Sequence, residues 1–138
     1  MHKKIVILIP LLILAAATMA ACASGNSLAG TTWALVSYGD PANSTAAAAG
    51  VDTSLTFNKD GTLGGNMGCN GFGGDYSVKD NVVTFENIFS TMMACEEPRM
   101  SQETTTFSIM NGDVAFIVDG NTLTLTAADG RVLVLSQN

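Results

Sequence analysis

The sequence predicts a mostly antiparallel β fold of the α+β class, in which a curved sheet or small barrel packs against one helix. Short runs rich in β-branched and apolar residues recur at a spacing of about 8–12 residues. Asn, Asp and Gly residues that favour turns separate these runs, and a single stretch beginning at Pro98 changes to helical spacing. Regularly spaced short strands with turn signals between them are typical of sandwiches and small barrels.

The first half of the domain contains three expected strands. Residues 32–38 form the first strand, and its Trp33, the only tryptophan, is expected in core or rim packing rather than as a platform for a ligand. Residues 39–50 are bracketed by Gly and Pro and lack an apolar period, which predicts a loop with room for one helical turn. The strands at 54–57 and from residue 62 flank a turn at 58–61, where Gly supplies a positive φ.

The second half continues the β pattern around one helix. Strands are expected at 75–78, 82–85, 114–118, 123–126 and 132–135, with a short extended piece at 88–91. Met100, Phe107 and Met110 recur at helical spacing after Pro98, which suits the first helical position, and Asn111-Gly112 supplies a stop. The glycines between 64 and 74 are interpreted as bulges or sharp bends, because no Lys-Ser or Lys-Thr pair completes a phosphate-binding loop.

The first 21 residues have the layout of an export signal, with Lys3 and Lys4 before the apolar run 5–14 and small residues at 15–21. The sequence Met-Ala-Ala-Cys that ends at Cys22 resembles a bacterial lipobox, so Cys22 is expected to carry lipid. Residues 22–27 would then form a short tether and residues 28–138 the folded domain. The alternative is an ordinary signal peptide cut near Ala21 or Ala23, with Cys22 as a plain residue.

Charge and histidine content narrow the function classes. Removing residues 1–21 takes away two lysines and no acid, so the formal net charge falls from −6 to −8. This acidic balance argues against nucleic acid, which needs a basic surface, and leaves membrane contact to the lipid anchor. The only histidine is His2, within the signal, so catalysis by Ser-His-Asp or Cys-His and ligation of a metal by imidazole are not expected of the domain.

The two remaining cysteines, Cys69 and Cys95, are expected to form a disulfide, because exported domains meet an oxidising compartment. Three alternatives stay open: a metal site, although two thiols are too few; a redox pair, although Cys-x-x-Cys is absent; and two reduced buried thiols. Methionines 92, 93 and 100 are interpreted as core filler rather than copper ligands. Glu96 and Glu97 are interpreted as turn and helix-cap charges rather than a catalytic pair. With the interpretations of the cysteines and methionines, this leaves neither a cofactor nor a metal expected.

Two short motifs carry a family resemblance. Gly68-Cys69-Asn70 is followed by Ser90-Thr91-Met92-Met93-Ala94-Cys95 and then by Glu103 and Phe107. These motifs resemble the META domain, the family of the heat-shock protein HslJ, and the motif positions are Gly68, Cys69, Asn70, Thr91, Met93, Ala94 and Cys95. The resemblance extends from Leu28 to Leu135. Thr104–Thr106 depart from it, since the family prefers better helix formers there.

The resemblance implies a cellular setting rather than a reaction. Family members are linked with heat shock, drug tolerance and motility or virulence, and lipoprotein forms are common among them. We therefore expect a lipid-anchored, extracytoplasmic and non-enzymatic accessory in envelope stress response or assembly. It would act through contacts with an envelope protein partner that the sequence does not identify. The alternatives are a small barrel that binds an apolar or peptide-like ligand and a protease inhibitor.

Overall fold

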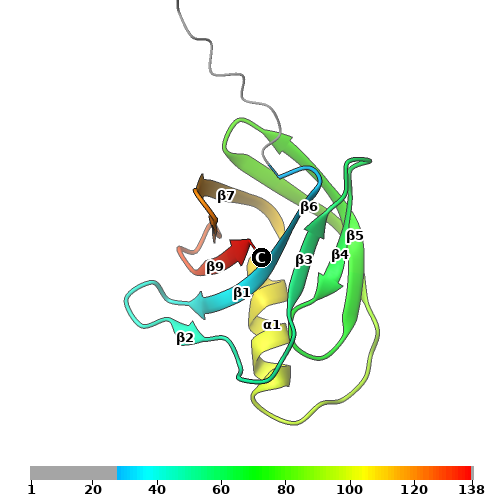
Figure 1. The fold of residues 1–138 in the computed structure, drawn as a ribbon, viewed down its shortest axis with the longest axis vertical. Coiled ribbons are helices and arrows are strands. Elements are labelled where there is room, and N and C mark those ends of the chain that lie inside the picture. Colours follow the sequence, from blue (N-terminus) through cyan, green and yellow to red (C-terminus); the bar gives the residue numbers. More distant parts are fainter. Residues whose placement is uncertain (1–27, 138) are drawn as a thin grey trace, which may run out of the picture.

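The computed structural model describes residues 28–137, which form an antiparallel barrel with one short helix (Figure 1). The elements are β1 (Thr31–Gly39), β2 (Thr45–Ala46), β3 (Ser54–Phe57), β4 (Thr62–Asn66), β5 (Gly71–Lys79), β6 (Val82–Ser90), α1 (Arg99–Ile109), β7 (Gly112–Asp119), β8 (Thr122–Thr126) and β9 (Val132–Gln137). The predicted fold class, mostly antiparallel β with one packed helix, is confirmed.

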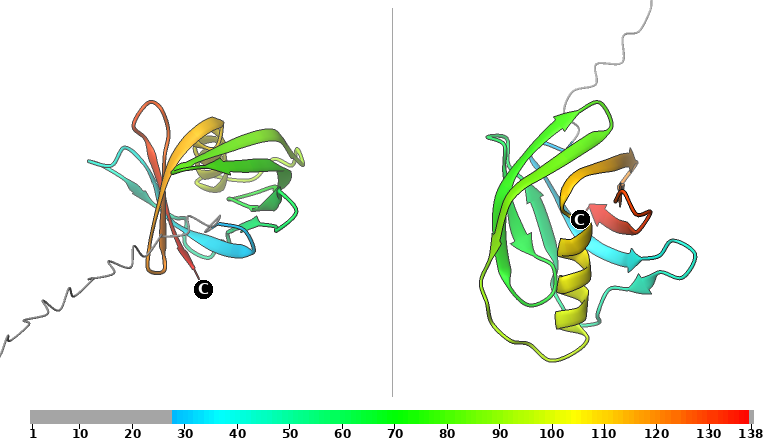
Figure 2. Two further views of the ribbon diagram at one scale, coloured as in Figure 1. Left: turned by 90° about the horizontal axis from the view of Figure 1, so that it is seen from above. Right: turned by 180° about the vertical axis from the view of Figure 1, so that it is seen from behind.

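The barrel closes because β9 pairs with β1. The strands follow the order β1-β3-β4-β5-β6-β7-β8-β9, and β9 returns to β1 over the register from Trp33↔Gln137 to Gly39↔Val132. Strand β1 bends at a bulge between Leu35 and Ser37. On one edge, its first residues pair with β3 and its last residues pair with β2. The view from above shows the strands arranged as a ring (Figure 2, left).

The inward faces of the strands supply a continuous apolar core. Trp33 is 1% exposed and belongs to this core, as the sequence predicts. Aromatic rings from three strands meet inside, since Phe57 contacts Tyr76 edge-on at 4.9 Å between centroids and Phe85 at 6.3 Å. Buried residues alternate with half-buried ones along β3 and most of β8, which follows from the two-residue period of a strand.

The predicted turn at 58–61 joins β3 to β4. Gly61 adopts a φ of +87°, which a side chain would disfavour, and the Asp60 carboxylate accepts hydrogen bonds from the N–H and hydroxyl of Thr62. These bonds to the ionised form lower the pKa of the exposed Asp60 carboxyl. The turn therefore fixes the register in which Phe57 lies opposite Leu63.

Two segments differ from the sequence prediction. The 39–50 loop contains β2 rather than a helical turn, because β3 covers β1 only from Thr31 to Trp33 and the edge beyond is covered by residues 45 and 46. Strand β6 is continuous over nine residues, where the sequence predicted two shorter pieces. Asn87 has a φ of 52°, and the pairing of β5 with β6 shifts there without breaking.

Strand β6 projects past the barrel wall. It pairs with β7 only from Val82 to Phe85, whereas its pairing with β5 continues to Ser90 opposite Phe72. The projecting part leads into the segment between β6 and α1, which forms the lower end of the molecule in Figure 1. Four of the five residues from 86 to 90 are exposed there.

Helix α1 begins at Arg99, directly after Pro98, whose peptide bond with Glu97 is cis. The helix packs against β1 and β9, and Figure 2 (right) shows it along one end of the barrel. The predicted apolar face is wrong in part: Met100 and Phe107 are half-buried, and the buried residues are Gln102, Glu103, Thr106 and Ile109. Between residues 28 and 137, no helix is long and apolar enough to cross a membrane.

Candidate functional site

The family motifs meet at the end of the barrel beside the start of α1. The turn between β4 and β5 carries Gly68, Cys69 and Asn70, and the segment after β6 carries Thr91 to Cys95. A disulfide joins Cys69 to Cys95 across 26 positions of sequence, with their Cα atoms 5.9 Å apart. Residues far apart in the chain are thus held covalently at one place.

Asn70 is the centre of this site. Its side chain is buried, with 2% of the residue exposed, and its Oδ1 accepts hydrogen bonds from the Thr91 hydroxyl and the Met93 N–H, both at 2.8 Å. Its Nδ2 donates to the Met93 carbonyl at 3.2 Å. One side-chain amide therefore fixes the 91–93 segment at both of its ends, Thr91 and Met93.

Glu103 on α1 holds Asn70 and its neighbour in place. One carboxylate oxygen accepts the backbone N–H groups of Cys69, at 2.9 Å, and of Asn70. The other oxygen accepts Asn70 Nδ2 at 2.7 Å. Glu103 is only 5% exposed, and a buried carboxylate is stable when several hydrogen bonds replace its lost hydration.

Two further α1 side chains bind the backbone of the β4–β5 turn. Gln102 donates to the Met67 carbonyl at 2.8 Å, and its Oε1 accepts the N–H of Ala48 at 2.7 Å. Arg99 Nε donates to the carbonyl of Gly68 at 3.0 Å. The helix face is polar because it packs against backbone groups, whose donors and acceptors need partners when buried.

Gly68 is required by close approach rather than by its backbone angle. A Cβ at this position would lie 2.6 Å from the carbonyl oxygen of Arg99 in the first turn of α1. No side chain is accommodated at that distance without moving the helix. The glycine of the first family motif therefore allows the turn and the helix to touch.

Asn70 acts between segments rather than within its own turn. Its φ is not positive, and its side chain bonds residues of two other segments. The local role belongs to Asn66, whose Oδ1 accepts the Gly68 N–H at 2.8 Å while its Nδ2 donates to the Cys69 carbonyl at 3.3 Å.

The methionines of the second motif are exposed, which corrects their interpretation as core filler. Met92 is 97% exposed and Met93 is 59% exposed. Phe89, on the projecting part of β6, is 69% exposed and its ring lies against Gly73, where an added Cβ would be 2.6 Å from the ring. The polar groups of the segment point inward, and its apolar side chains face solvent.

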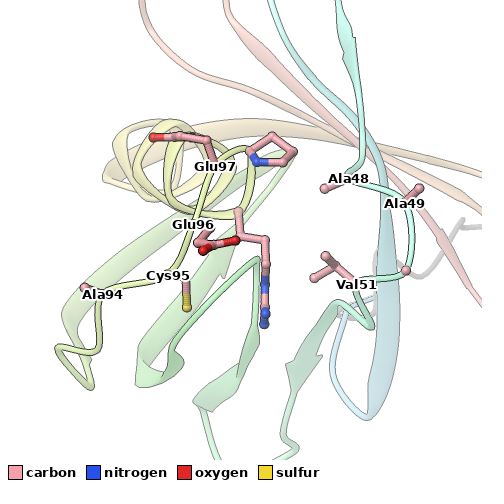
Figure 3. Close-up of a pocket in the computed structure, with 10 residues that line it drawn as sticks. Ala48, Ala49, Val51, Ala94, Cys95, Glu96 and Glu97 are labelled. Atoms are coloured by element: carbon pink, nitrogen blue, oxygen red, sulfur yellow. The ribbon is translucent and has the colours of Figure 1, made fainter.

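Two surface pockets flank the disulfide-linked segment. The first, of about 470 Å³, lies between residues 48–51 and residues 94–99 (Figure 3). The second, of about 350 Å³, is lined mainly by the 91–94 segment together with Asn70, Met100 and Glu103. Among residues 28–137, no group of three or more His, Cys, Asp or Glu side chains is placed to hold a metal ion.

The acidic pair before α1 has the predicted position at the helix start. Glu97 Oε2 accepts the N–H of Ser101 at 3.1 Å, which satisfies one donor of the first turn. Burial raises the pKa of the Tyr38 hydroxyl, and the negative charge of Glu97 raises it further. Glu96 and Glu97 are both exposed and line the first pocket.

The structure brings together every motif position that the sequence singled out, from Gly68 to Asn70 and from Thr91 to Cys95. Cys22 lies outside the described residues. Sequence reasoning gave no role to Arg99, Gln102 or Asn66. A signal existed for Glu103, because it belongs to the family resemblance, but nothing in the sequence identified its partners.

The polar groups of the site stabilise its own conformation. Cys69 and Cys95 are oxidised, and Asn70, Glu103 and Gln102 all bond to protein partners. Within the described range, every buried side-chain nitrogen and oxygen atom has a hydrogen-bond partner. The buried polar groups of the site are therefore used within the protein, while Met92 and Met93 face solvent.

Comparison with solved structures shows the same fold in distant proteins. An NMR structure of a protein from Burkholderia xenovorans is similar with a TM-score of 0.69 and 21% identity, over 80% of this chain and 83% of that one. A crystal structure of a DUF4847 family protein from Bacteroides vulgatus is similar with a TM-score of 0.58 and 20% identity, over 82% and 96% of the two chains.

The family follows from a comparison with family models. No curated protein is matched. The model of the META domain matches residues 26–138, which include the barrel, α1 and both cysteine motifs. The chain belongs to the META-domain family.

Proposed function

We propose that this META-domain protein is a lipid-anchored, extracytoplasmic accessory that acts in envelope stress response or assembly through protein contacts, without catalysing a reaction. One observation carries the proposal: Asn70 and the disulfide fix the 91–95 segment while Met92 and Met93 face solvent. Exposed apolar side chains on a fixed backbone favour protein recognition, because little backbone conformational entropy is lost on binding.

The proposed location is supported by the N-terminal sequence and the disulfide. Residues 1–21 have the layout of an export signal, and the following Cys22 is the expected site of lipid attachment. Disulfides persist in oxidising compartments, which agrees with export. A lipid anchor would keep the domain beside a membrane without a spanning helix.

Fractionation of cells tests the location. The wild-type protein is expected in the membrane fraction, with acyl chains on a peptide that begins at Cys22. Cys22→Ala is expected in the soluble envelope fraction with an intact barrel. Membrane association of this variant equal to that of the wild type would contradict lipid anchoring.

Site-specific crosslinking tests the protein contact. A photoreactive residue placed at Met93 is expected to capture one envelope protein in living cells, whereas the same residue at the exposed Ile117 is the matched control. A deletion strain under heat or antibiotic stress, complemented with wild type or Cys22→Ala, shows whether stress tolerance needs the membrane anchor. Equal capture from both positions would contradict a specific surface at the 91–95 segment.

A ligand-binding role is the second candidate, and the pocket shown in Figure 3 favours it. Its volume of about 470 Å³ lies in the range of small-molecule sites, roughly 300–1,000 Å³. The barrel interior is occupied by the apolar core, which argues against a ligand inside the barrel. Native mass spectrometry of protein purified from the envelope would detect a retained small molecule.

A further inference from the structure

Met92 lies between two residues that are both bound to Asn70. On its amino side, the Thr91 N–H donates to the Gly71 carbonyl at 3.0 Å and the Thr91 hydroxyl donates to Asn70 Oδ1 at 2.8 Å. On its carboxyl side, the Met93 N–H donates to the same Oδ1 at 2.8 Å, and the Met93 carbonyl accepts Asn70 Nδ2 at 3.2 Å. The backbone is therefore fixed on both sides of one residue.

The base of this arrangement is itself rigid. Asn70 is buried and donates its side-chain amide to Glu103 on α1 at 2.7 Å. Two residues beyond Met93, Cys95 is joined by its disulfide to Cys69, the neighbour of Asn70. Strand β5, the helix and a covalent bond thus all hold the segment that carries Met92.

The outer surface of the segment has the opposite character. Met92 is 97% exposed, and Met93 and Phe89 add further apolar area on the same segment and the strand before it. An exposed, unbranched apolar side chain between two fixed residues has the form of a substrate residue presented to an endopeptidase. In such enzymes, a specificity pocket accepts the side chain just before the cleaved bond.

We infer that residues 90–94 form a substrate-like inhibitory segment, and that the Met92 side chain enters the apolar specificity pocket of an endopeptidase. The inference rests on the proposed function because it names the class of protein partner. Protease–inhibitor complexes are among the tightest known for their interface size, and their backbones move little on binding. A segment held in one conformation before binding suits both properties: its backbone has little need to move, and little affinity is lost to ordering it.

The same contacts explain why cleavage would not release the enzyme quickly. Hydrolysis of the peptide bond between Met92 and Met93 adds one water, leaving a carboxylate on Met92 and an amino group on Met93. The two new ends remain linked through the Cys69–Cys95 disulfide and through the bonds of Asn70 to Thr91 and Met93. Held side by side, the ends favour resynthesis of the bond over separation.

A specificity switch tests the inference with two enzymes of known pocket chemistry. Chymotrypsin has an apolar specificity pocket, and trypsin has one with a buried aspartate. Full-length wild-type protein is expected to inhibit chymotrypsin. Met92→Lys is expected to lower the inhibition constant for trypsin by at least about 100-fold relative to wild type, because the change falls on the residue that enters the pocket.

The matched control is Ile117→Lys, which adds the same charge at another exposed apolar position, 65% exposed on β7. This variant is not expected to inhibit trypsin. Neither Met92 nor Ile117 belongs to the apolar core, so folding is expected to be unchanged in both variants. Circular dichroism and the unfolding midpoint check this directly.

A second variant tests the positioning by Asn70. Thr91→Val removes the hydroxyl donor to Asn70 Oδ1 and keeps the side-chain shape. Loss of one neutral hydrogen bond is expected to raise the inhibition constant by about 5-fold and to speed cleavage after position 92. Mass spectrometry follows that cleavage as the gain of one water in a chain still joined by its disulfide.

Three outcomes would overturn the inference. The first is no inhibition of chymotrypsin by wild type and none of trypsin by Met92→Lys. The others are rapid cleavage after position 92 without inhibition, and equal inhibition of trypsin by Met92→Lys and Ile117→Lys. The proposed function would survive any of them if crosslinking at Met93 captured an envelope protein that is not a protease. If crosslinking captured nothing while inhibition was observed, the inhibitory segment would stand without the envelope role.

Discussion

The carboxylate of Glu103 binds both the backbone N–H and the side-chain amide of Asn70, and so connects helix α1 to the turn between β4 and β5. The two family motifs are linked through this pair, because Asn70 in the first motif also accepts hydrogen bonds from Thr91 and Met93 in the second. The order of the 91–95 segment therefore depends on a helix residue that lies outside both motifs.

Glu103→Ala is expected to lower the free energy of unfolding by about 3–5 kcal/mol, because the buried N–H groups of Cys69 and Asn70 lose their acceptor and Asn70 Nδ2 keeps only the Met93 carbonyl. Chemical denaturation measures the change. Glu96→Gln, at an exposed position, is the control and should stay within about 0.5 kcal/mol of wild type. A loss below about 1 kcal/mol for Glu103→Ala, roughly the worth of one ordinary hydrogen bond, would contradict the central role of this carboxylate.

Gly68→Ala is expected to cost about 2 kcal/mol or more, since its Cβ would lie 2.6 Å from the backbone oxygen of Arg99. Gly71→Ala is the matched control two residues beyond the motif cysteine. The nearest atom to its added Cβ is 4.0 Å away, so a change within about 0.5 kcal/mol is expected. Equal effects of the two substitutions in denaturation curves would show that the helix does not press on Gly68.

Strand positions were predictable where a turn residue stands at each end. Asn58 to Gly61 marks the β3–β4 hairpin, and Asp119 to Asn121 marks the β7–β8 hairpin, because both turns need backbone angles that few residues adopt. The length of β6 was not predictable, since Asn87 resembles a turn residue and instead forms an irregularity within a continuous pair of strands.

The site was predictable as a set of motif residues but not as a network. The pairing of Cys69 with Cys95 follows from there being two cysteines after Cys22, whereas the partners of Glu103 are two backbone N–H groups and one side-chain amide that no local pattern reveals. Apolar composition suggested that Met92 and Met93 belong to the core. Their exposure follows from the inward polar bonds of Asn70, which arise only once β5, β6 and α1 have assembled.

Reduction of the Cys69–Cys95 disulfide is expected to lower the free energy of unfolding by about 3 kcal/mol, the loop-entropy value for a closed loop of this length. The double variant Cys69→Ala/Cys95→Ala should match the reduced wild type. Because the barrel strands do not depend on the bridge, faster hydrogen exchange is expected mainly in residues 91–97. Two thiols open to alkylation in native protein would show instead that the pair is reduced.

Titration of Tyr38 tests the electrostatics at the start of α1. Burial, and then the charge of Glu97, raise the pKa of this hydroxyl above its ordinary value of 10.0, so the folded protein keeps the proton to higher pH than the unfolded chain. Stability relative to Tyr38→Phe is therefore full below the unfolded pKa and is lost as pH rises through the folded one. The near-ultraviolet absorbance of tyrosinate, compared between wild type and Tyr38→Phe, gives the midpoint. Glu97→Gln is expected to lower that midpoint without restoring the ordinary value, because burial is the larger cause. A higher midpoint in Glu97→Gln would show that the carboxylate does not act on Tyr38.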